Sequence, residues 1–441
     1  MSIFKAYDVR GIYPSELDEE LAYKAGRAFV TFLKIKSVVV SQDMRESSSS
    51  LKRSLIKGII DQGADVLEVE GLCSTPRNYF ACWSLKAPGS IMVTASHNPG
   101  KYNGFKFTRE KAIPISGETG IKNIEKLVLE NKFKDIGKKG KVIKKNIVDD
   151  YKKHILSLFD HKRIKPLKVV IDAGNGMGGR DMDLILTELP LKVIRMYFDP
   201  DGNFPNHEAN PLETENVVEL QKKVVSENAD LGIALDGDAD RVFFVDEKGR
   251  IVPADFITCL LAEEILKRKK GTVLYDLRSS WIVAETIRKH GGKPLMSRVG
   301  HAFIKEQMRK EKAVFAGELS GHFYFQDNFN TDSGIVAAVR ILEIISKENK
   351  KFSELVKPYE HYCQTGEINF EVKDKEGKMK ELEKKYSTGK VSHLDGIRID
   401  FDDWWFNARA SNTEPLLRLN LEAKSRKLME EKKKEISIIL S

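Results

Sequence analysis

The stretch Ile91–Phe107 reads IMVTASHNPGKYNGFKF, and the interpretation of the whole chain starts from it. Its three apolar residues at the start indicate a buried strand, and the alternating apolar residues at its end indicate a second strand. The proline and glycines between these runs exclude a helix. The pattern therefore predicts strand, polar loop and strand, with Ser96 at the end of the first strand. Loops in such positions carry function more often than cores do.

Ser96 does not fit the pattern of a triad nucleophile. The G-x-S-x-G elbow is absent. Neighbouring side chains on extended backbone point to opposite faces, so we do not expect His97 to act as the base for Ser96. An ordinary turn, in which Ser96 and Asn98 bond to nearby backbone, is the structural alternative.

Composition indicates a globular protein with several domains. A chain of 441 residues is too long for one core and suggests three or four domains. We see no apolar run near the ~18 residues that a membrane span needs, and no secretory signal. The four cysteines lack C-x-x-C spacing, which argues against a disulfide framework or a zinc site. We expect a cytoplasmic protein without a membrane partner.

The formal net charge of +8 is modest for this length. Lysines gather in Lys132–Lys145 and Arg426–Lys434, but neither run carries the interleaved aromatic residues of a nucleic-acid groove. We interpret both runs as solvated surface and expect no nucleic-acid partner. A mild positive excess is also compatible with anionic substrates, although this is weak evidence.

Apolar runs alternate with helical patterns along the first three quarters of the chain, which is typical of α/β folds. Pro14-Ser15 is expected to begin the first helix. A later strand, Leu167–Ile171, leads into a turn whose glycines follow G-x-G-x-x-G spacing. A dinucleotide site is one interpretation of that turn, but a lone match of this kind is weak evidence.

A second strand-and-loop unit carries three carboxylates at alternate positions: Asp236, Asp238 and Asp240. So many carboxylates in one tight loop are costly to hold without a cation, and oxygen ligands suit magnesium or calcium. The spacing partly matches an EF-hand. However, the position that must be glycine is Arg241 and the flanks are strands, so the EF-hand interpretation fails.

Two further loops combine small polar residues with charge. Gly317–His322, GELSGH, follows a short strand, and its carboxylate and hydroxyl suit vicinal diols or plain turn chemistry. Arg409–Pro415, RASNTEP, can form an anion nest or an ordinary cap.

The TASHNP, DGDADR, GELSGH and RASNTEP motifs, in this order, resemble those of the α-D-phosphohexomutases, the phosphomannomutase/phosphoglucomutase family. The resemblance covers essentially the whole chain. It implies an α/β fold of three similar domains with mixed sheets, plus a smaller C-terminal α+β domain, around a central cleft. The expected domains are 1–149 with the active serine, 150–250 with the metal loop, 251–359 with the sugar loop, and 360–441 with the phosphate loop.

The same resemblance implies a role for each motif. Ser96 would carry a phosphoryl group and complete a Mg²⁺ site with Asp236, Asp238 and Asp240, and Arg241 would face the substrate. Lys106 is the candidate for proton transfer or charge stabilisation, and His97 would orient the loop. The predicted sugar contacts are Glu318 and Ser320, with Arg278, His301 and His322 as further contacts. The predicted phosphate contacts are Arg409, Ser411, Asn412 and Thr413, with Arg418 as a further contact. Tyr7 and Arg10, in an opening that resembles the family's Y-D-x-R-G, would lie at the rim of the site.

The implied activity is a mutase that interconverts hexose 1-phosphate and hexose 6-phosphate. It would use a phosphoserine enzyme and hexose 1,6-bisphosphate as intermediate and activator. None of the motif residues addresses C2, where mannose and glucose differ, so the expectation covers both sugars. Phosphoglucosamine mutases typically have glutamine where Leu319 stands, and a phosphopentomutase is a further alternative. A Mg²⁺-dependent phosphatase and a catalytically silent binding relative are the competitors from other classes. The expected partners are small sugar phosphates, and the expected assembly is a monomer or homodimer.

Overall fold

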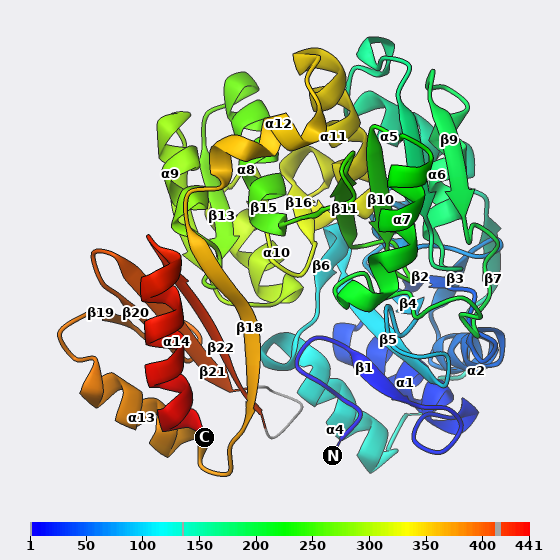
Figure 1. Ribbon diagram of the computed structural model, residues 1–441. Coiled ribbons are helices and arrows are strands. Elements are labelled where there is room, and N and C mark those ends of the chain that lie inside the picture. Colours follow the sequence, from blue (N-terminus) through cyan, green and yellow to red (C-terminus); the bar gives the residue numbers. More distant parts are fainter. Residues whose placement is uncertain (1, 135, 411–415) are drawn as a thin grey trace. The chain divides into compact units, whose positions relative to one another are not determined.

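The computed structural model describes residues 2–134, 136–410 and 416–441 (Figure 1). The chain forms two compact units. The first contains Met1–Pro253 and Ser320–Leu355, and the second contains Ala254–Leu319 and Val356–Ser441. The order of the residues along the chain therefore does not follow the division into units, because Ser320–Leu355 belongs to the first unit although Ala254–Leu319, which precedes it, belongs to the second.

The first unit opens with a mixed sheet in the strand order β1-β5-β4-β2-β3-β7, with β6 paired to β5. Its central strands are parallel, whereas β5 is antiparallel to β4 and β1. The elements are β1 (Val9–Ile12), α1 (Glu19–Leu33), β2 (Ser37–Gln42), α2 (Ser48–Asp61), β3 (Asp65–Val69), α3 (Thr75–Ser84), β4 (Gly89–Val93), β5 (Tyr102–Arg109), β6 (Ile113–Pro114), α4 (Lys122–Glu130) and β7 (Val142–Lys145). The strand, loop and strand predicted from Ile91–Phe107 are confirmed as β4, its loop and β5.

The first helix begins later than the sequence suggested. The side chain of Asp18 accepts a hydrogen bond of 2.8 Å from the backbone N–H of Leu21, which makes Asp18 the cap of α1. The expected start at Pro14-Ser15 was therefore wrong. Glu16, the one acidic residue between Ser15 and Asp18, belongs to the turn that precedes the helix.

The second sheet of the first unit has the order β12-β11-β10-β8-β9. Strand β10 is parallel to β8 and antiparallel to β11, and Leu235 pairs with Val242 at the end of that hairpin. The acidic loop 236–241 therefore closes a hairpin of two buried strands. The elements are α5 (Val148–Ser157), β8 (Lys168–Asp172), α6 (Gly178–Leu186), β9 (Lys192–Met196), α7 (Val218–Ser226), β10 (Leu231–Leu235), β11 (Val242–Asp246) and β12 (Ile251–Val252).

The late segment of the first unit is built around the helix α11 (Gly334–Glu348). This helix is buried without interruption from Gly334 to Ser346, and it contacts α6 and β11. The antiparallel pair β16 (Phe323–Phe325) and β17 (Thr331–Asp332) precedes it, and α12 (Phe352–Val356) follows it. A helix buried along nearly its whole length is a core element of its unit.

The second unit contains a group of parallel strands and a separate antiparallel sheet. Strand β13 (Thr272–Asp276) is parallel to β14 (Lys293–Ser297) and β15 (Phe315–Gly317), and α8 (Ala254–Arg268), α9 (Trp281–Lys289) and α10 (His301–Lys310) belong to this part. The antiparallel sheet has the order β18-β22-β21-β20-β19. Its elements are β18 (Cys363–Glu371), α13 (Lys375–Lys385), β19 (Lys390–Ser392), β20 (Ile397–Asp400), β21 (Trp404–Ala410), β22 (Leu416–Ala423) and α14 (Arg426–Leu440). Helices α13 and α14 pack on this sheet through Leu382 and Ile436.

These elements confirm the predicted fold class of mixed α/β sheets followed by a smaller α+β part. The expected domain 251–359 contributes residues 254–319 to the second unit and residues 320–355 to the first. The bounds of the four domains stay a prediction. No helix among the described residues is long and apolar enough to cross a bilayer.

Candidate active site

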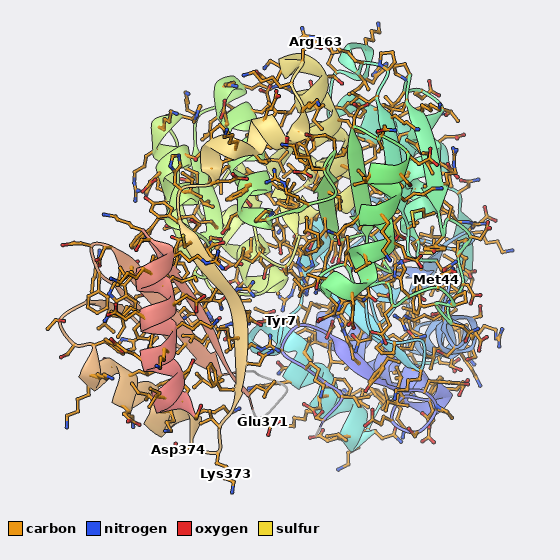
Figure 2. All side chains as sticks on the ribbon, viewed as in Figure 1. Tyr7, Met44, Arg163, Glu371, Lys373 and Asp374 are labelled. Carbon is orange, nitrogen blue, oxygen red and sulfur yellow. The ribbon has the colours of Figure 1, made fainter. Side chains whose placement is uncertain are left out.

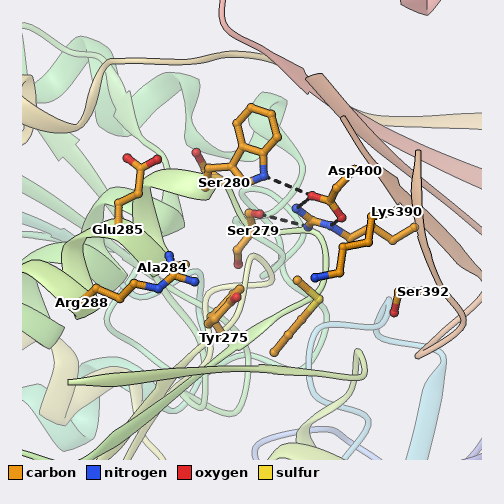
Figure 3. Close-up of a pocket in the computed structure, with 12 residues that line it drawn as sticks. Tyr275, Ser279, Ser280, Ala284, Glu285, Arg288, Lys390, Ser392 and Asp400 are labelled. Carbon is orange, nitrogen blue, oxygen red and sulfur yellow. Dashed lines mark hydrogen bonds and ion pairs between the residues drawn. The ribbon is translucent and has the colours of Figure 1, made fainter. Parts of the chain in front are cut away.

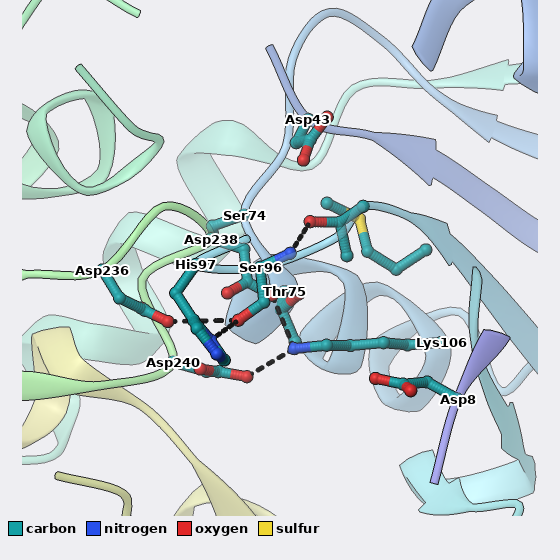
Figure 4. Close-up of polar contacts among 12 residues, drawn as sticks. Asp8, Asp43, Ser74, Thr75, Ser96, His97, Lys106, Asp236, Asp238 and Asp240 are labelled. Atoms are coloured by element: carbon teal, nitrogen blue, oxygen red, sulfur yellow. Dashed lines mark hydrogen bonds and ion pairs between the residues drawn. The ribbon is translucent and has the colours of Figure 1, made fainter. Parts of the chain in front are cut away.

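Ser96 follows β4 in a loop that holds it in left-handed backbone, with φ +54°. The residue is 1% exposed. Its backbone N–H donates to Oγ1 of Thr94, and its own hydroxyl donates to Oδ2 of Asp236 over 3.2 Å (Figure 4). Left-handed backbone at a non-glycine residue persists only where the surroundings enforce it. The surrounding structure therefore holds Ser96 in a strained backbone conformation that directs its hydroxyl at the acidic loop 236–241.

The guanidinium of Arg45, which follows β2, fixes the loop 94–101 between β4 and β5, here called the serine loop. It is buried and donates to the carbonyl oxygens of Ser96 and Asn98 at 2.8 and 2.5 Å. It also donates to those of Pro99 and Tyr102 at 2.8 and 2.9 Å. One side chain thus satisfies three carbonyl groups of the loop and one at the start of β5, which makes Arg45 a positioning residue. This role was not predicted from the sequence, where its only indication is an arginine just after a buried strand.

The acidic loop approaches the serine loop at Gly237. A Cβ atom at this position would lie 2.4 Å from the backbone oxygen of Ser96, a distance that side chains do not tolerate. Glycine is therefore required for the two loops to meet. Gly176 is required for a similar reason, since its Cβ would lie 2.7 Å from the oxygen of Gly237. The glycines that resemble a dinucleotide motif include one that makes room for the acidic loop.

The acidic loop brings Asp236, Asp238 and Asp240 together, and all three are buried. Lys106 Nζ lies 2.6 Å from Oδ2 of Asp238 and 2.6 Å from Oδ2 of Asp240 (Figure 4). Thr75 also donates to Oδ2 of Asp238. Thr75 was not singled out from the sequence, because only the fold places the start of α3 beside this loop.

The charges of this cluster displace its pKa values in opposite directions. Burial, with the charges of Asp240 and Asp238, raises the pKa of Asp236 well above its ordinary range. Burial also acts to raise the pKa of Asp240, but Lys106 and His322 outweigh it and hold that pKa well below the ordinary range. Burial acts to lower the pKa of Lys106, but Asp238 and Asp240 raise it. One ammonium group is therefore the local counter-charge of several carboxylates.

The donor set fits a hard divalent cation. Ligand oxygens of Asp236, Asp238 and Asp240 lie within 4.8 Å of one another. In the described part of the chain, Oδ1 of Asp238 is buried and accepts no hydrogen bond. Such an oxygen is costly unless something positive binds it, and carboxylate oxygens are the ligands that Mg²⁺ and Ca²⁺ take. A second group that could hold a metal ion, Asp240, His322 and Asp332, adjoins the first.

The structure corrects the expectation about His97. Its Nδ1 lies 3.2 Å from Oγ of Ser96, so the two neighbouring side chains meet (Figure 4). The expectation assumed extended backbone, whereas Ser96 is left-handed and brings consecutive side chains to one side. Burial, and then the charges of Arg241 and Arg10, lower the pKa of His97 well below its ordinary value. The imidazole beside the serine is therefore neutral at physiological pH.

The N-terminal residues reach the same loop through Arg10. Its Nε donates to Asp8 over 2.8 Å, and its Nη1 donates to the side-chain oxygen of Asn98 over 2.5 Å. Strand β1 sets this position, because Arg10 pairs with Gly104 in β5. Tyr7, labelled in Figure 2, is half-buried two residues before β1.

Arg241 and His322 lie side by side at the end of the acidic loop, joined by an antiparallel bridge. Arg241 Nε donates to Nε2 of His322 over 3.4 Å and lies 3.9 Å from Oδ2 of Asp236. His322 Nε2 lies 3.4 Å from Asp240, and its Nδ1 is 2.8 Å from Oγ of Ser320. His322 therefore lies beside the acidic cluster, and Ser320 contacts it through His322.

The second unit holds a cluster of three arginines around Glu367. Oε2 of this carboxylate lies 3.3 Å from Arg278 and 3.3 Å from Arg409, and Oε1 lies 3.3 Å from Arg418. Burial acts to raise the pKa of Glu367, but the three arginines lower it overall. Arg409 is buried, and its Nε has no hydrogen-bond partner among the described residues. The arginines were predicted from the sequence, whereas Glu367, which lies 42 residues before Arg409, was not.

Glu318 lies next to this cluster. Its Oε1 accepts from the backbone N–H of Gly300 over 3.2 Å and lies 3.7 Å from Nη2 of Arg278. Arg278 is held in place by Asp276 at 2.8 Å. His301 is the first residue of α10. The predicted phosphate contacts Ser411, Asn412 and Thr413 lie outside the described residues.

Comparison with known proteins finds matches along nearly the whole chain. Models of phosphoglucomutase/phosphomannomutase match it in order: alpha/beta/alpha domain I over residues 1–135, domain II over 149–249, domain III over 253–362, and the C-terminal domain over 367–438. A phosphomannomutase of Vibrio cholerae serotype O1 is 42% identical over 457 residues, with 100% of this chain and 98% of the relative covered. A phosphomannomutase of Escherichia coli K12 is 41% identical over 435 residues, with 96% and 95% covered.

A crystal structure gives the same result. A phosphoglucomutase/phosphomannomutase family protein of Burkholderia thailandensis is 33% identical and superimposes with a TM-score of 0.91, covering 99% of this chain and 96% of its own. The four matched regions and this overlap extend over nearly the full length, as the motifs implied. The chain belongs to the phosphoglucomutase/phosphomannomutase family, the α-D-phosphohexomutases.

Proposed function

We propose that this protein interconverts hexose 1-phosphates and hexose 6-phosphates of mannose, glucose or both, with Ser96 as the phosphoryl carrier. The observation that supports this most directly is the contact of Ser96 Oγ with Asp236 in a cluster of three carboxylates and one lysine. Phosphoryl transfer depends on positioning and charge neutralisation more than on covalent catalysis. A serine held by Arg45 beside such a cluster is suited to that chemistry.

The carboxylates of Asp236, Asp238 and Asp240 would hold Mg²⁺ together with an oxygen of phosphorylated Ser96. Bound there, the ion would neutralise charge on the phosphoryl group. Lys106 supplies a second positive charge to the same site, and Arg241 a third at its edge. These charges act in a buried, low-dielectric place, where their effect on a phosphoryl group is large.

In the first transfer, the bond from phosphorus to Oγ of Ser96 breaks as a bond to O6 of the hexose 1-phosphate forms. The proton of the O6 hydroxyl leaves at the same time. His322 is the candidate that accepts that proton, whereas Lys106, whose pKa Asp238 and Asp240 raise, keeps its own proton and stabilises the charge. His97, neutral and 3.2 Å from Oγ, orients the serine hydroxyl. The product would be hexose 1,6-bisphosphate, which turns around so that the C1 phosphate returns to Ser96.

The phosphate group that is not transferred would bind at Arg278 and Arg409, with Arg418 nearby. Both pair with Glu367 in this structure, so the substrate phosphate would take over cations that a carboxylate now holds. Glu318, next to Arg278, would accept hydrogen bonds from the sugar hydroxyls. Ser320, Ser411, Asn412 and Thr413 would complete these contacts.

The test is a mutase assay with Mg²⁺ and a trace of glucose 1,6-bisphosphate. We would compare glucose 1-phosphate, mannose 1-phosphate, glucosamine 1-phosphate and ribose 1-phosphate by conversion to the isomeric phosphate. Comparable turnover of the first two supports a dual-specificity hexomutase. Preference for glucosamine or ribose would move the proposal to those mutases. Release of inorganic phosphate without isomerisation would replace the mutase proposal with a phosphatase.

A further inference from the structure

The second unit contains a cavity of about 380 Å³ that none of the predicted roles uses (Figure 3). Helix α9 and strand β13 form one side, and strands β19 and β20 of the antiparallel sheet form the other. A volume of this size lies within the range of small-molecule sites, about 300–1,000 Å³. The cavity can therefore admit a metabolite rather than only water.

Two cations at this cavity have no ion pair, and the lining carries a net charge of +1, from Arg288, Lys390 and Arg398 against Glu285 and Asp400. Arg288 of α9 and Lys390 of β19 line it, and neither has an ion pair with any residue that the structure describes. Figure 3 shows both side chains extending into the same space from opposite sides. Of the two acidic lining residues, only Asp400 has an ion pair among the described residues. Glu285 accepts from the hydroxyl of Tyr362 over 2.6 Å, and Asp400 pairs with Arg398 at 2.9 Å.

Hydroxyl groups add donors to the same space. Tyr275, Ser279 and Ser392 line the cavity, and none of their hydroxyls has a hydrogen bond within the described ranges. Burial raises the pKa of Tyr275 despite the opposing charges of Arg398 and Arg288, so its hydroxyl keeps its proton at neutral pH. The lining is thus rich in unused donors, and a ligand that fits it must be rich in acceptors.

We propose that this cavity binds the phosphate group of a small phosphorylated metabolite. A phosphate monoester carries a charge of about −1.5 to −2 at pH 7 and three acceptor oxygens, which match two free cations and several hydroxyls. A carboxylate would supply one charge and two oxygens, and would leave donors unused. The apolar side chains of Ala284 and Met296 line the same cavity and suit the organic part of the ligand.

This site is separate from the predicted substrate phosphate site. Arg278, Arg409 and Glu367 are absent from the lining of the cavity. The segment after β13 lies between the two, since Arg398 holds the carbonyl oxygen of Leu277 at 2.5 Å on the cavity side. Arg278 turns instead to Asp276 and Glu367. The inference therefore stands independently of the proposed mutase function.

The probe for the test is phenyl phosphate, which combines a phosphate monoester with an apolar group and lacks sugar hydroxyls. It is titrated into the full-length protein by calorimetry. All proteins in this test carry Arg409→Gln, which removes a cation of the predicted substrate phosphate site and leaves the lining of the cavity unchanged, so that binding at the cavity is measured. We expect saturable binding of one molecule per chain. The double variant Arg288→Gln/Lys390→Gln should bind at least tenfold more weakly.

The matched control is Lys289→Gln, which removes the same charge from the neighbouring position of α9, outside the cavity lining. It should bind phenyl phosphate as Arg409→Gln alone does. Arg288→Lys keeps the charge and should bind more tightly than Arg288→Gln, and thermal unfolding of each variant checks that it is folded. Binding unchanged in the double variant, an equal loss in Lys289→Gln, or no saturable binding to Arg409→Gln alone would overturn the proposal.

Discussion

The Nζ atom of Lys106 lies 2.6 Å from Oδ2 of Asp238, a residue 132 positions away in the chain. The same ammonium lies 2.6 Å from Asp240. Lys106 is in turn placed by β5, where it pairs with Met92 of β4, the strand that leads to Ser96. One strand pair therefore sets both the serine and the cation that the acidic cluster needs.

Replacing this lysine should destabilise the protein when no metal is bound. Lys106→Met leaves buried carboxylates without their counter-charge, and we expect the free energy of unfolding to fall by roughly 3 kcal/mol. Added Mg²⁺ should restore much of that loss. Denaturant unfolding with a chelator and with Mg²⁺ measures both effects. Lys101→Met, an exposed lysine in the serine loop, is the control. Equal stability of Lys106→Met and wild type in the chelator would refute the role.

Ser96→Ala should abolish most turnover, because it removes the oxygen that carries the phosphoryl group. We expect kcat to fall by at least about a thousandfold, as for the loss of other nucleophiles. Binding of glucose 1-phosphate should change little, since the variant retains the arginine cluster. The peptide containing Ser96 should gain one phosphoryl group in the wild type after incubation with glucose 1,6-bisphosphate. Near-wild-type turnover in the variant would end the phosphoserine proposal.

Glu367→Gln should strengthen the binding of phosphate rather than weaken it. The carboxylate competes for Arg278 and Arg409, so its neutral analogue frees both cations. Inorganic phosphate should inhibit this variant about fivefold to tenfold more strongly, which is about 1–1.4 kcal/mol. Glu371→Gln, on the same strand and labelled in Figure 2, is the control. Weaker inhibition in Glu367→Gln would show that the glutamate orients the arginines instead.

The buried carboxyl of Asp255 predicts a pH dependence of stability. Burial raises its pKa from 3.8 to about 7, although the Ser280 N–H and Gln364 donate to it. Between pH 4 and pH 7 the folded state binds a proton that the unfolded state has lost. The contribution of this group to stability therefore falls as pH rises through that window and stays low above it.

Asp255→Asn removes this dependence. The difference in free energy of unfolding between variant and wild type should move in favour of the variant by on the order of 4 kcal/mol from pH 4 to pH 8. Denaturant unfolding at both values measures it, and the comparison across pH cancels the local cost of the substitution. A pH-independent difference would contradict the raised pKa.

The sequence predicted elements better than it predicted the directions of side chains. Apolar runs located β4, β5, β10 and β11, because buried strands follow simple periodicity. The His97 side chain was misjudged because left-handed backbone at Ser96 arises from tertiary contacts and not from local sequence. At a strained loop, contacts with the rest of the fold are expected to outweigh the backbone conformation that the local sequence prefers.

Residues that act through distant partners could not be found from the sequence. Arg45 serves a loop about fifty residues later, and Glu367 joins arginines from three separate strands or loops. Neither lies in a recognisable motif, and their partners are defined only by the fold. The family resemblance gave the motif residues, whereas geometry gave the residues that hold them.

The burial of α11 also constrains synthesis of the protein. This helix packs on β11 and α6 but is made about ninety residues after β11, since Ala254–Leu319 is translated in between. While the ribosome elongates the chain, the apolar surface that α11 will cover has no partner from its own unit. Such surface is prone to aggregate until it is covered. Expression that slows translation between Pro253 and Ser320 should therefore lower the soluble yield, even though the mature protein is unchanged.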